Sequence, residues 1–287
     1  MFRSPDTLTT VDLHPWNTGF AWVDHAGPFR SLTPEQVARY DERGYVVVPD
    51  LVPPDLLARV RDEIDRFERP TADFLATLDG GRFSIAEADA ITFTTHLVAR
   101  SRPLRDLARH PRIVGICADL LGPDVRLYWD QAVYKKPDKP RRFPWHQDNG
   151  YAFVEPQQYL TVWVALTDAT ADNGCPVVAP GFHRLGTLAH HFVDPLGWEC
   201  LTDPAEAVTA EVPAGGAVVF SSLTPHLTGP NTTGDERKAY ILQYAPEGAE
   251  VLHGDPASGP PSERVACDAP ERQFLVLADG RPVAEPG

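Results

Sequence analysis

The spacing of hydrophobic residues along the chain changes near residue 125. Before that point apolar residues recur at helical intervals, and Leu57, Val60, Ile64 and Phe67 would share one buried face of a helix. Beyond it, short runs rich in Val, Leu, Tyr and Trp alternate with clusters of Gly, Pro, Asn and Asp, which is typical of strands joined by turns. The pattern predicts a β-sandwich or barrel preceded by helices.

Local signals define the first predicted helix, over residues 31–44. Thr33 can cap its N-terminus, Pro34 suits the first helical position, and Gln36 stands where a capping box needs it. Gly44 would end the helix. Both ends of this element are therefore predicted from neighbouring residues alone.

Further elements follow from the same pattern. Residues 53–67 and 102–121 are helical in spacing, and Pro111 interrupts the second of these segments. The predicted strands share a high content of β-branched and aromatic residues, and they cover residues 44–50, 124–136, 158–169, 175–180, 215–222, 238–246 and 272–279.

Length and composition favour one domain. A chain of 287 residues with 43% hydrophobic content can bury one sizeable core, and all-β barrels of this length often fold as single domains. We expect one domain, mainly β with flanking helices. Its parts would be an N-terminal arm (1–30), a mainly helical flank (31–124), a β core with the functional site (125–247) and a C-terminal extension (248–287).

Charge and cysteine content narrow the class of partner. The 26 basic and 40 acidic residues give a net charge of -14, which disfavours nucleic acid and anionic membrane surfaces as partners. No segment has the apolar length of a signal peptide or a membrane span. The four cysteines lie far apart without CxxC spacing, so neither a zinc knuckle nor a disulfide framework is indicated. We expect a cytoplasmic protein that acts on a small molecule.

A histidine and an aspartate stand two residues apart in the stretch FPWHQDNG. If this stretch ends a strand, its period of two places His146 and Asp148 on one face and turns Gln147 away. Such a pair alone is a weak signal, because a surface histidine and aspartate beside a turn give the same pattern. His226 strengthens the signal, because it also stands where an apolar strand meets a turn, 78 residues after Asp148. Two histidines and one carboxylate suit ferrous iron with open positions, although zinc accepts the same ligands.

An arginine follows His226 by eleven residues. Arg237 shares strand parity with Ala239 and Ile241, so its guanidinium would point into the barrel, where a buried cation requires an anion. The fork of an arginine matches a carboxylate, and Thr228 could add a hydroxyl donor. The alternative is a rim arginine paired with one of the two preceding acidic residues.

Four segments carry a resemblance to a known family. They are LTPEQVARYDERGYVVVPDLVPPDLL (32–57), WHQD (145–148), DNGCPVVAPG (172–181) and HLTGPNTTGDERKAYILQY (226–244). In this order and spacing, the chain resembles the phytanoyl-CoA dioxygenase family of iron- and 2-oxoglutarate-dependent oxygenases over residues 32–247. The resemblance implies a double-stranded β-helix, the jelly roll related to the cupins, in agreement with the strand-rich pattern.

The resemblance also implies the site residues. The family's iron ligands fall on His146, Asp148 and His226. The positions that contact 2-oxoglutarate fall on Arg237, Thr228, Trp163 and Gln131. For Trp163 and Gln131 a plain core or ladder role is the alternative.

The implied activity uses Fe(II), 2-oxoglutarate and O2, and it releases succinate and CO2 while hydroxylating an unactivated C–H bond of a small metabolite. Asp148 favours a hydroxylase, because related halogenases lack that carboxylate. Desaturation, epoxidation and cyclisation remain open. The alternatives from other classes are a zinc hydrolase of cupin-like fold, which the spacing to Arg237 disfavours, and a noncatalytic jelly-roll protein that binds a metabolite.

Other polar residues have two interpretations each. A basic cluster at residues 135–142 could attract an anionic substrate or form a solvated hairpin loop; it contains Lys135, Lys136, Lys139, Arg141 and Arg142. Phe182 stands where the family usually has a small polar residue, and His183 would face the pocket or lie in a solvated loop. His190 and His191 are expected at the surface.

Overall fold

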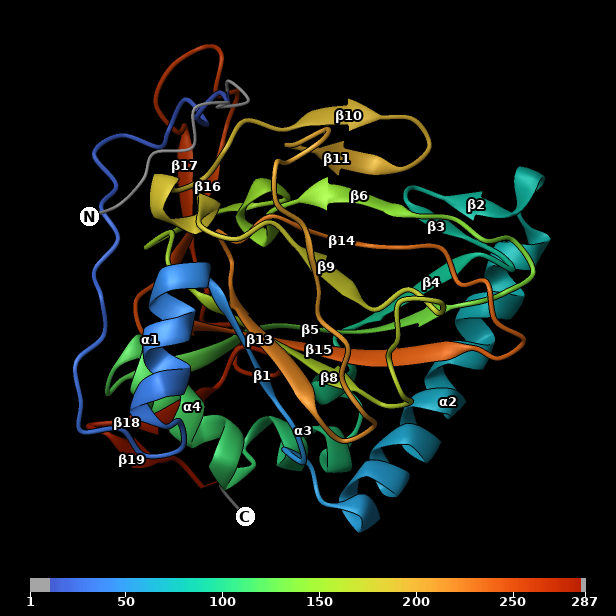
Figure 1. Cartoon of the computed structure of the whole chain (residues 1–287), viewed down its shortest axis with the longest axis horizontal. Helices are drawn as coiled ribbons and strands as arrows, with labels where there is room; N and C mark the ends of the chain where they lie inside the picture. The colour runs from blue at the N-terminus through green and yellow to red at the C-terminus, as the bar shows by residue number, and fades with distance from the viewer. Residues whose placement is uncertain (1–10, 285–287) are drawn as a thin grey trace.

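The computed structural model describes residues 11–284. Residues 1–10 of the predicted arm and 285–287 of the predicted C-terminal extension lie outside the described residues (Figure 1).

The helices are α1 (Pro34–Arg43), α2 (Pro54–Thr77), α3 (Arg102–Ala108) and α4 (Pro111–Leu121), with 3-10 turns η1 (Asp79–Gly81), η2 (Leu97–Ala99), η3 (Asp148–Gly150) and η4 (Phe182–Leu185). The strands up to the metal motif are β1 (Tyr45–Val48), β2 (Arg82–Phe83), β3 (Ala86–Glu87), β4 (Ile91–Thr95), β5 (Val125–Lys135) and β6 (Phe143–His146). Those after it are β7 (Phe153–Glu155), β8 (Leu160–Ala165), β9 (Pro176–Val178), β10 (His191–Val193), β11 (Gly197–Glu199), β12 (Val208–Thr209) and β13 (Ala217–Ser221). The last strands are β14 (His226–Thr228), β15 (Arg237–Pro246), β16 (Glu250–His253), β17 (Glu263–Ala266), β18 (Leu275–Ala278) and β19 (Arg281–Pro282).

The predicted helix signals are confirmed. Thr33 and Gln36 form both bonds of a capping box at α1, and Gly44 ends the helix with φ 81°. A Cβ at Gly44 would lie 2.5 Å from Thr224 Oγ1, so this position needs glycine for space as well as for backbone conformation. Pro111 begins α4 and thereby separates it from α3, and α2 runs ten residues beyond its predicted end at Phe67, to Thr77.

Two antiparallel sheets form the predicted jelly roll. The larger has ten strands and follows the order β1-β13-β8-β15-β5-β4-β3-β2, with β18 also paired to β5 and β19 paired to β18. The smaller follows the order β12-β9-β14-β6. Because β1 and β4 come from the predicted helical flank and β18 from the predicted extension, the flank, the core and the extension all contribute strands to one sheet.

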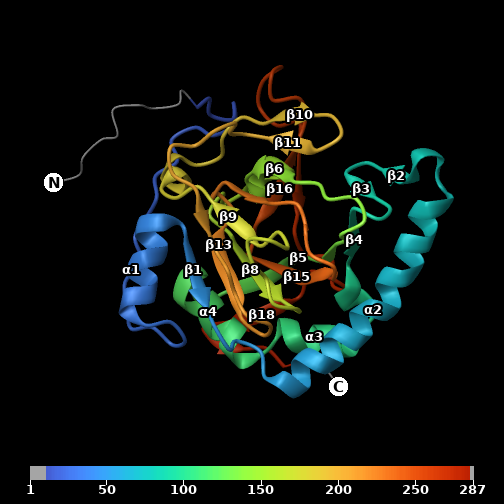
Figure 2. The same cartoon turned by 45° about the vertical axis from the view of Figure 1, so that its right-hand side comes forward.

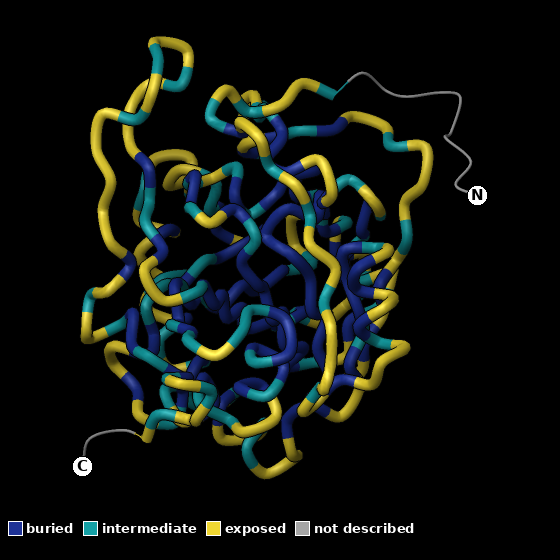
Figure 3. Tube along the Cα trace, turned by 90° about the vertical axis from the view of Figure 1, so that its left-hand side faces the viewer, coloured by how far each residue is buried: buried dark blue, intermediate teal, exposed yellow. Residues whose placement is uncertain are grey.

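The larger sheet is buried on both faces. Val162 and Val164 of β8 belong to the apolar cluster under α1–α4, whereas Trp163 between them belongs to the cluster that faces the smaller sheet. Figures 1 and 2 show the helices on one side of this sheet and β6, β9 and β14 on the other, and Figure 3 shows the buried residues gathered between these layers. Side chains of the larger sheet that point toward the smaller sheet are therefore the ones able to form a site between the two sheets.

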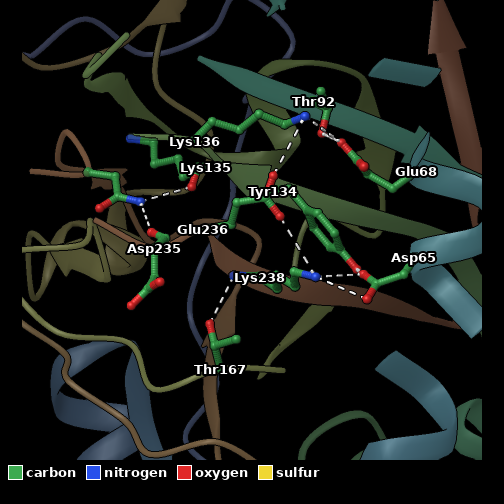
Figure 4. Close-up of polar contacts among 11 residues, drawn as sticks. Asp65, Glu68, Thr92, Tyr134, Lys135, Lys136, Thr167, Asp235, Glu236 and Lys238 are labelled. Atoms are coloured by element: carbon green, nitrogen blue, oxygen red, sulfur yellow. Dashed lines mark hydrogen bonds and ion pairs between the residues drawn. The ribbon is translucent and has the colours of Figure 1, made fainter. Parts of the chain in front are cut away.

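Polar contacts fasten α2 to the outer face of the larger sheet (Figure 4). The Tyr134 hydroxyl of β5 donates to Asp65 at 2.5 Å, and Lys238 of β15 donates to the same carboxylate at 2.8 Å. Lys136 pairs with Glu68 one turn along the helix, at 3.2 Å. These bonds keep the charges of α2 away from the interior of the barrel.

The described part of the N-terminal arm packs on the body. Leu13 bridges to Leu188, and Trp16 donates from its indole nitrogen to the Gly259 carbonyl at 2.7 Å. Within residues 11–284 no helix is both long and apolar enough to cross a bilayer.

Candidate active site

Three side chains capable of binding a metal meet between the sheets. His146 ends β6 and His226 begins β14, and the two residues are direct partners across the antiparallel pair. The Nε2 atoms of both histidines lie 3.8 Å from Oδ1 of Asp148. One ligand atom from each residue falls within 4.8 Å of the other two, so a single ion could contact all three.

Backbone carbonyls orient both imidazoles. His146 donates from Nδ1 to the Pro144 carbonyl at 2.9 Å, and His226 donates from Nδ1 to the Thr224 carbonyl at 3.0 Å. Because a carbonyl only accepts, Nδ1 carries the proton and Nε2 offers its lone pair toward Asp148. Burial, with His226 alongside, holds the pKa of His146 well below its usual range, which keeps this ring neutral and able to bind a metal.

Asp148 reaches the site from a turn and not from a strand. The strand period predicted that His146 and Asp148 share a face, but β6 ends at His146 and Asp148 opens η3. Thr161 of β8 donates to Asp148 Oδ2 at 2.5 Å and accepts from the Gln243 amide at 3.3 Å. Sequence reasoning missed Thr161 and Gln243, although Thr161 shares strand parity with Trp163 and Gln243 shares it with Arg237.

Gln147 points away from the metal site, as predicted. Its amide donates to the carbonyls of Gly186 and Leu223 and accepts from the Leu188 backbone. Its backbone N–H donates to Nε2 of His190 at 3.0 Å. His191 is exposed, as expected, whereas His190 is half-buried and both of its ring nitrogens bond to the backbone, so the expectation of a surface ring is wrong for His190. Burial lowers the pKa of His190 to about 4.

A narrow inner cavity extends from the three ligands to Arg237. Trp163, Thr228 and Gln131 also line it, so the structure brings together all seven site residues that the sequence predicts. Arg237 is 1% exposed, and its Cζ lies 5.1 Å from the centre of the Trp163 ring. The alternative of a rim arginine in a surface ion pair is therefore wrong.

The Arg237 guanidinium lacks an anion among the described residues. Nη1 donates to the Val133 carbonyl at the long distance of 3.5 Å, while the buried Nε and Nη2 have no partner there. Burial lowers the pKa of Arg237 to about 10. A carboxylate from a ligand would satisfy both the charge and the fork of this side chain, so the cavity fits a dicarboxylate that also reaches the metal.

The basic cluster at residues 135–142 does not present free charges. Lys135 is buried as the last residue of β5, and its amine donates to the carbonyls of Arg141 at 2.8 Å, Thr228 at 2.9 Å and Gly229. Burial, followed by the charges of Arg237 and Arg141, holds its pKa well below the usual range. The hairpin-loop interpretation is therefore wrong for Lys135, which lies within the strand predicted over residues 124–136.

The remaining cations of the basic cluster also have partners. Lys139 lies 3.8 Å from Asp89, Arg141 donates to Glu87 at 2.9 Å, and Arg142 donates to Glu199 at 2.8 Å. Lys136 pairs with α2 as described above.

Neither interpretation of His183 holds. The ring is fully buried, its Nε2 donates to the Asp41 carbonyl at 3.0 Å, and burial lowers its pKa to about 4. Its neighbour Phe182 packs beside an apolar cluster that contains Trp145 and Leu201. Both residues hold the loop after β9 against the body, and neither lines the inner cavity.

The sequence of this chain is similar to a known family model and to proteins of known activity. The sequence model for phytanoyl-CoA dioxygenase (PhyH) matches residues 40–239. This chain belongs to the phytanoyl-CoA dioxygenase family. Mouse peroxisomal phytanoyl-CoA dioxygenase is 28% identical over 261 residues, which are 84% of this chain and 75% of the mouse protein. Methylphosphonate hydroxylase from Gimesia maris is 26% identical over 230 residues, which are 75% of this chain and 81% of that protein.

A solved structure of a non-heme, alpha ketoglutarate-dependent enzyme shares the fold. The epimerase SnoN, crystallised with Fe3+, alpha ketoglutarate and nogalamycin RO, superposes with a TM-score of 0.66 at 25% identity and covers 84% of this chain and 97% of its own. The predictions of a jelly roll and of an Fe(II)- and 2-oxoglutarate-dependent dioxygenase are confirmed at this level.

Proposed function

We propose that this chain hydroxylates an unactivated C–H bond of a small metabolite, using Fe(II) held by His146, Asp148 and His226. 2-Oxoglutarate would bind in the inner cavity, with its distal carboxylate on Arg237 and Thr228. The observation that supports this most strongly is the buried guanidinium without an anion, in the same cavity as a metal-binding cluster. Trp163 and Gln131 would line the cosubstrate, since both border this cavity.

The bound iron, together with 2-oxoglutarate and O2, supplies the oxidising power that breaks the C–H bond, and succinate and CO2 leave. The protein residues orient the reactants. Thr161 would hold one oxygen of Asp148 so that the other faces the two imidazoles. Phe220 and Ile241 would exclude water, because both are apolar and line the cavity.

One domain would carry this activity. Strands from the predicted flank, core and extension pair within one sheet, so we infer that residues 1–287 act as a single oxygenase domain. The site draws on β5, β6, β8, β14 and β15, and removing any of the three parts would break the sheet that supports it.

The test is incubation of the Fe(II)-loaded protein with 2-oxoglutarate, O2 and a metabolite library, followed by mass spectrometry of the products. We expect succinate and a product that has gained one oxygen atom. A product that has lost two hydrogens would assign desaturation or cyclisation to the same site. Absence of succinate with every library compound and without any would contradict the proposed function.

A further inference from the structure

A second, larger chamber opens from the metal site toward solvent. Its volume is about 470 Å³, within the usual range of pockets for small molecules. It shares Phe93, Gln131, Phe143, His146 and Asp148 with the inner cavity, so a molecule in this chamber would lie against the metal ligands. Its position makes it the chamber for the substrate that is oxidised.

Aromatic rings dominate the wall of this outer chamber. They come from six different segments of the chain, and they are Phe83, Phe93, Tyr128, Trp129, Phe143, Tyr151 and Tyr159. Phe83 is 65% exposed in the β2–β3 hairpin, where it forms part of the lip. An exposed phenylalanine at the entrance and stacked rings inside suit a ligand with flat apolar surface.

The polar groups of the outer chamber carry no positive charge. Amides and hydroxyls come from Gln131, Gln243, Thr95 and Ser84. Of the described residues that line it, none is a lysine or an arginine, and the ionisable metal-binding groups are His146 and Asp148. Iron(II) held by the three ligands would have its charge offset by the Asp148 carboxylate and by bound 2-oxoglutarate, so an anion would lose its hydration there without gaining an unneutralised cationic partner, whereas neutral hydroxyl or carbonyl groups could bond to the amides.

Cations near the lip are engaged by carboxylates. Arg82 and Arg141 both contact Glu87, at 3.0 and 2.9 Å. Behind Trp129, Arg272 contacts Glu271 at 3.5 Å and lies 3.0 Å from the His96 ring, outside the chamber wall. The whole chain has a net charge of -14, so the rest of the protein also repels an approaching polyanion.

We propose that the outer chamber selects an uncharged, ring-containing small molecule and rejects anions, including thioester carriers that bear phosphates. This inference rests on the proposed function, because it assigns the substrate class of the same site. Specificity would come from the aromatic walls and from the amides of Gln131 and Gln243. The basic cluster at residues 135–142 would have no part in it, since its side chains are engaged elsewhere.

The test compares two probes of nearly the same shape and different charge, 2-naphthalenesulfonamide and 2-naphthalenesulfonate. Each is titrated anaerobically into protein loaded with Fe(II) and 2-oxoglutarate, and binding is measured by calorimetry. We expect the neutral sulfonamide to bind at least about tenfold more tightly, a difference of about 1.4 kcal/mol. Equal or tighter binding of the sulfonate would overturn the inference.

A cation placed in the chamber should weaken or abolish this preference. Thr95→Lys introduces an ammonium at the wall, whereas Thr209→Lys adds the same charge on the exposed edge strand β12. Thr95→Lys should tighten sulfonate binding relative to the sulfonamide by about tenfold, and Thr209→Lys should leave the wild-type ratio. The same ratio in both variants would place the probes outside the chamber and overturn the inference.

Succinate formation by the same preparations separates the two claims. Protein that converts 2-oxoglutarate to succinate but prefers the sulfonate refutes the substrate class alone. Protein that forms no succinate refutes the proposed function, whichever probe it prefers.

Discussion

Replacement of Arg237 by methionine should change cosubstrate affinity and protein stability in opposite directions. Burial lowers the pKa of Arg237 from 12.5 to about 10, so the folded protein disfavours the charged side chain by about 3 kcal/mol at roughly 1.4 kcal/mol per pH unit. Methionine fills similar apolar space without that charge. In the absence of 2-oxoglutarate, Arg237→Met should therefore unfold at the same or a higher urea concentration than the wild type.

The affinity of Arg237→Met for 2-oxoglutarate should fall. Loss of a buried, charge-assisted contact typically costs about 2–5 kcal/mol, and the lower limit corresponds to about a thirtyfold rise in Kd. The assay is an anaerobic titration of the Fe(II)-loaded protein with 2-oxoglutarate, followed by tryptophan fluorescence, because Trp163 lies beside the guanidinium. Arg237→Lys should give an intermediate Kd, since lysine keeps the positive charge but lacks the two parallel N–H donors of the guanidinium.

Lys238→Met is the matched control. Lys238 is the next residue of β15, but its amine bonds to Asp65 of α2 on the opposite face. It should leave the Kd for 2-oxoglutarate unchanged. If Arg237→Met also leaves the Kd unchanged, Arg237 does not bind 2-oxoglutarate. If Arg237→Met destabilises the protein by several kcal/mol without cosubstrate, Arg237 has a structural partner. Either result would refute its assignment as the cosubstrate anchor.

Three further predictions concern the support of the site. Thr161→Val removes the hydroxyl that bonds Asp148, and Fe(II) affinity measured by chelator competition should fall about 10- to 100-fold; unchanged affinity would refute an orienting role. Gly44→Ala should lower the free energy of unfolding by about 1–3 kcal/mol in urea titrations, because φ is 81° there, and a wild-type midpoint would contradict this. The pKa values of His183 and His190 are lowered to about 4, so between pH 6.5 and 4 the unfolded state binds more protons than the folded state. Stability should fall with falling pH in this window, by up to about 1.4 kcal/mol per pH unit for each ring, and His183→Gln should reduce the slope of urea midpoint against pH.

The parts of the fold that could be predicted depend on residues close together in the chain. The capping box of α1 and the strand parity of Arg237 involve neighbours a few positions apart, and both are confirmed. The family motifs predicted the three residues that cluster around the metal position. The order of these three residues along the chain was enough to identify them, because each stands where a strand meets a turn.

The parts that could not be predicted depend on which segments meet in space. Thr161 bonds Asp148 only because β8 passes beneath the turn after β6, and no local pattern contains that contact. Lys135 lies in a run of cations that is typical of a solvated loop, yet the last pair of β5 and β15 buries it beside Arg237. His183 is buried and His190 half-buried for the same reason, since the loops that carry them pack against segments distant in the sequence.

The formation of succinate from 2-oxoglutarate, without added substrate, is the most direct test of the assigned iron ligands and cosubstrate site. We expect slow, O2-dependent release by the Fe(II)-loaded wild type, because Arg237 and the metal-binding residues together complete a cosubstrate site. His226→Ala, reconstituted anaerobically with Fe(II), should bind iron weakly and release no succinate above the rate of free iron. Equal release by the variant and the wild type would contradict the assignment of His146, Asp148 and His226 as the iron ligands.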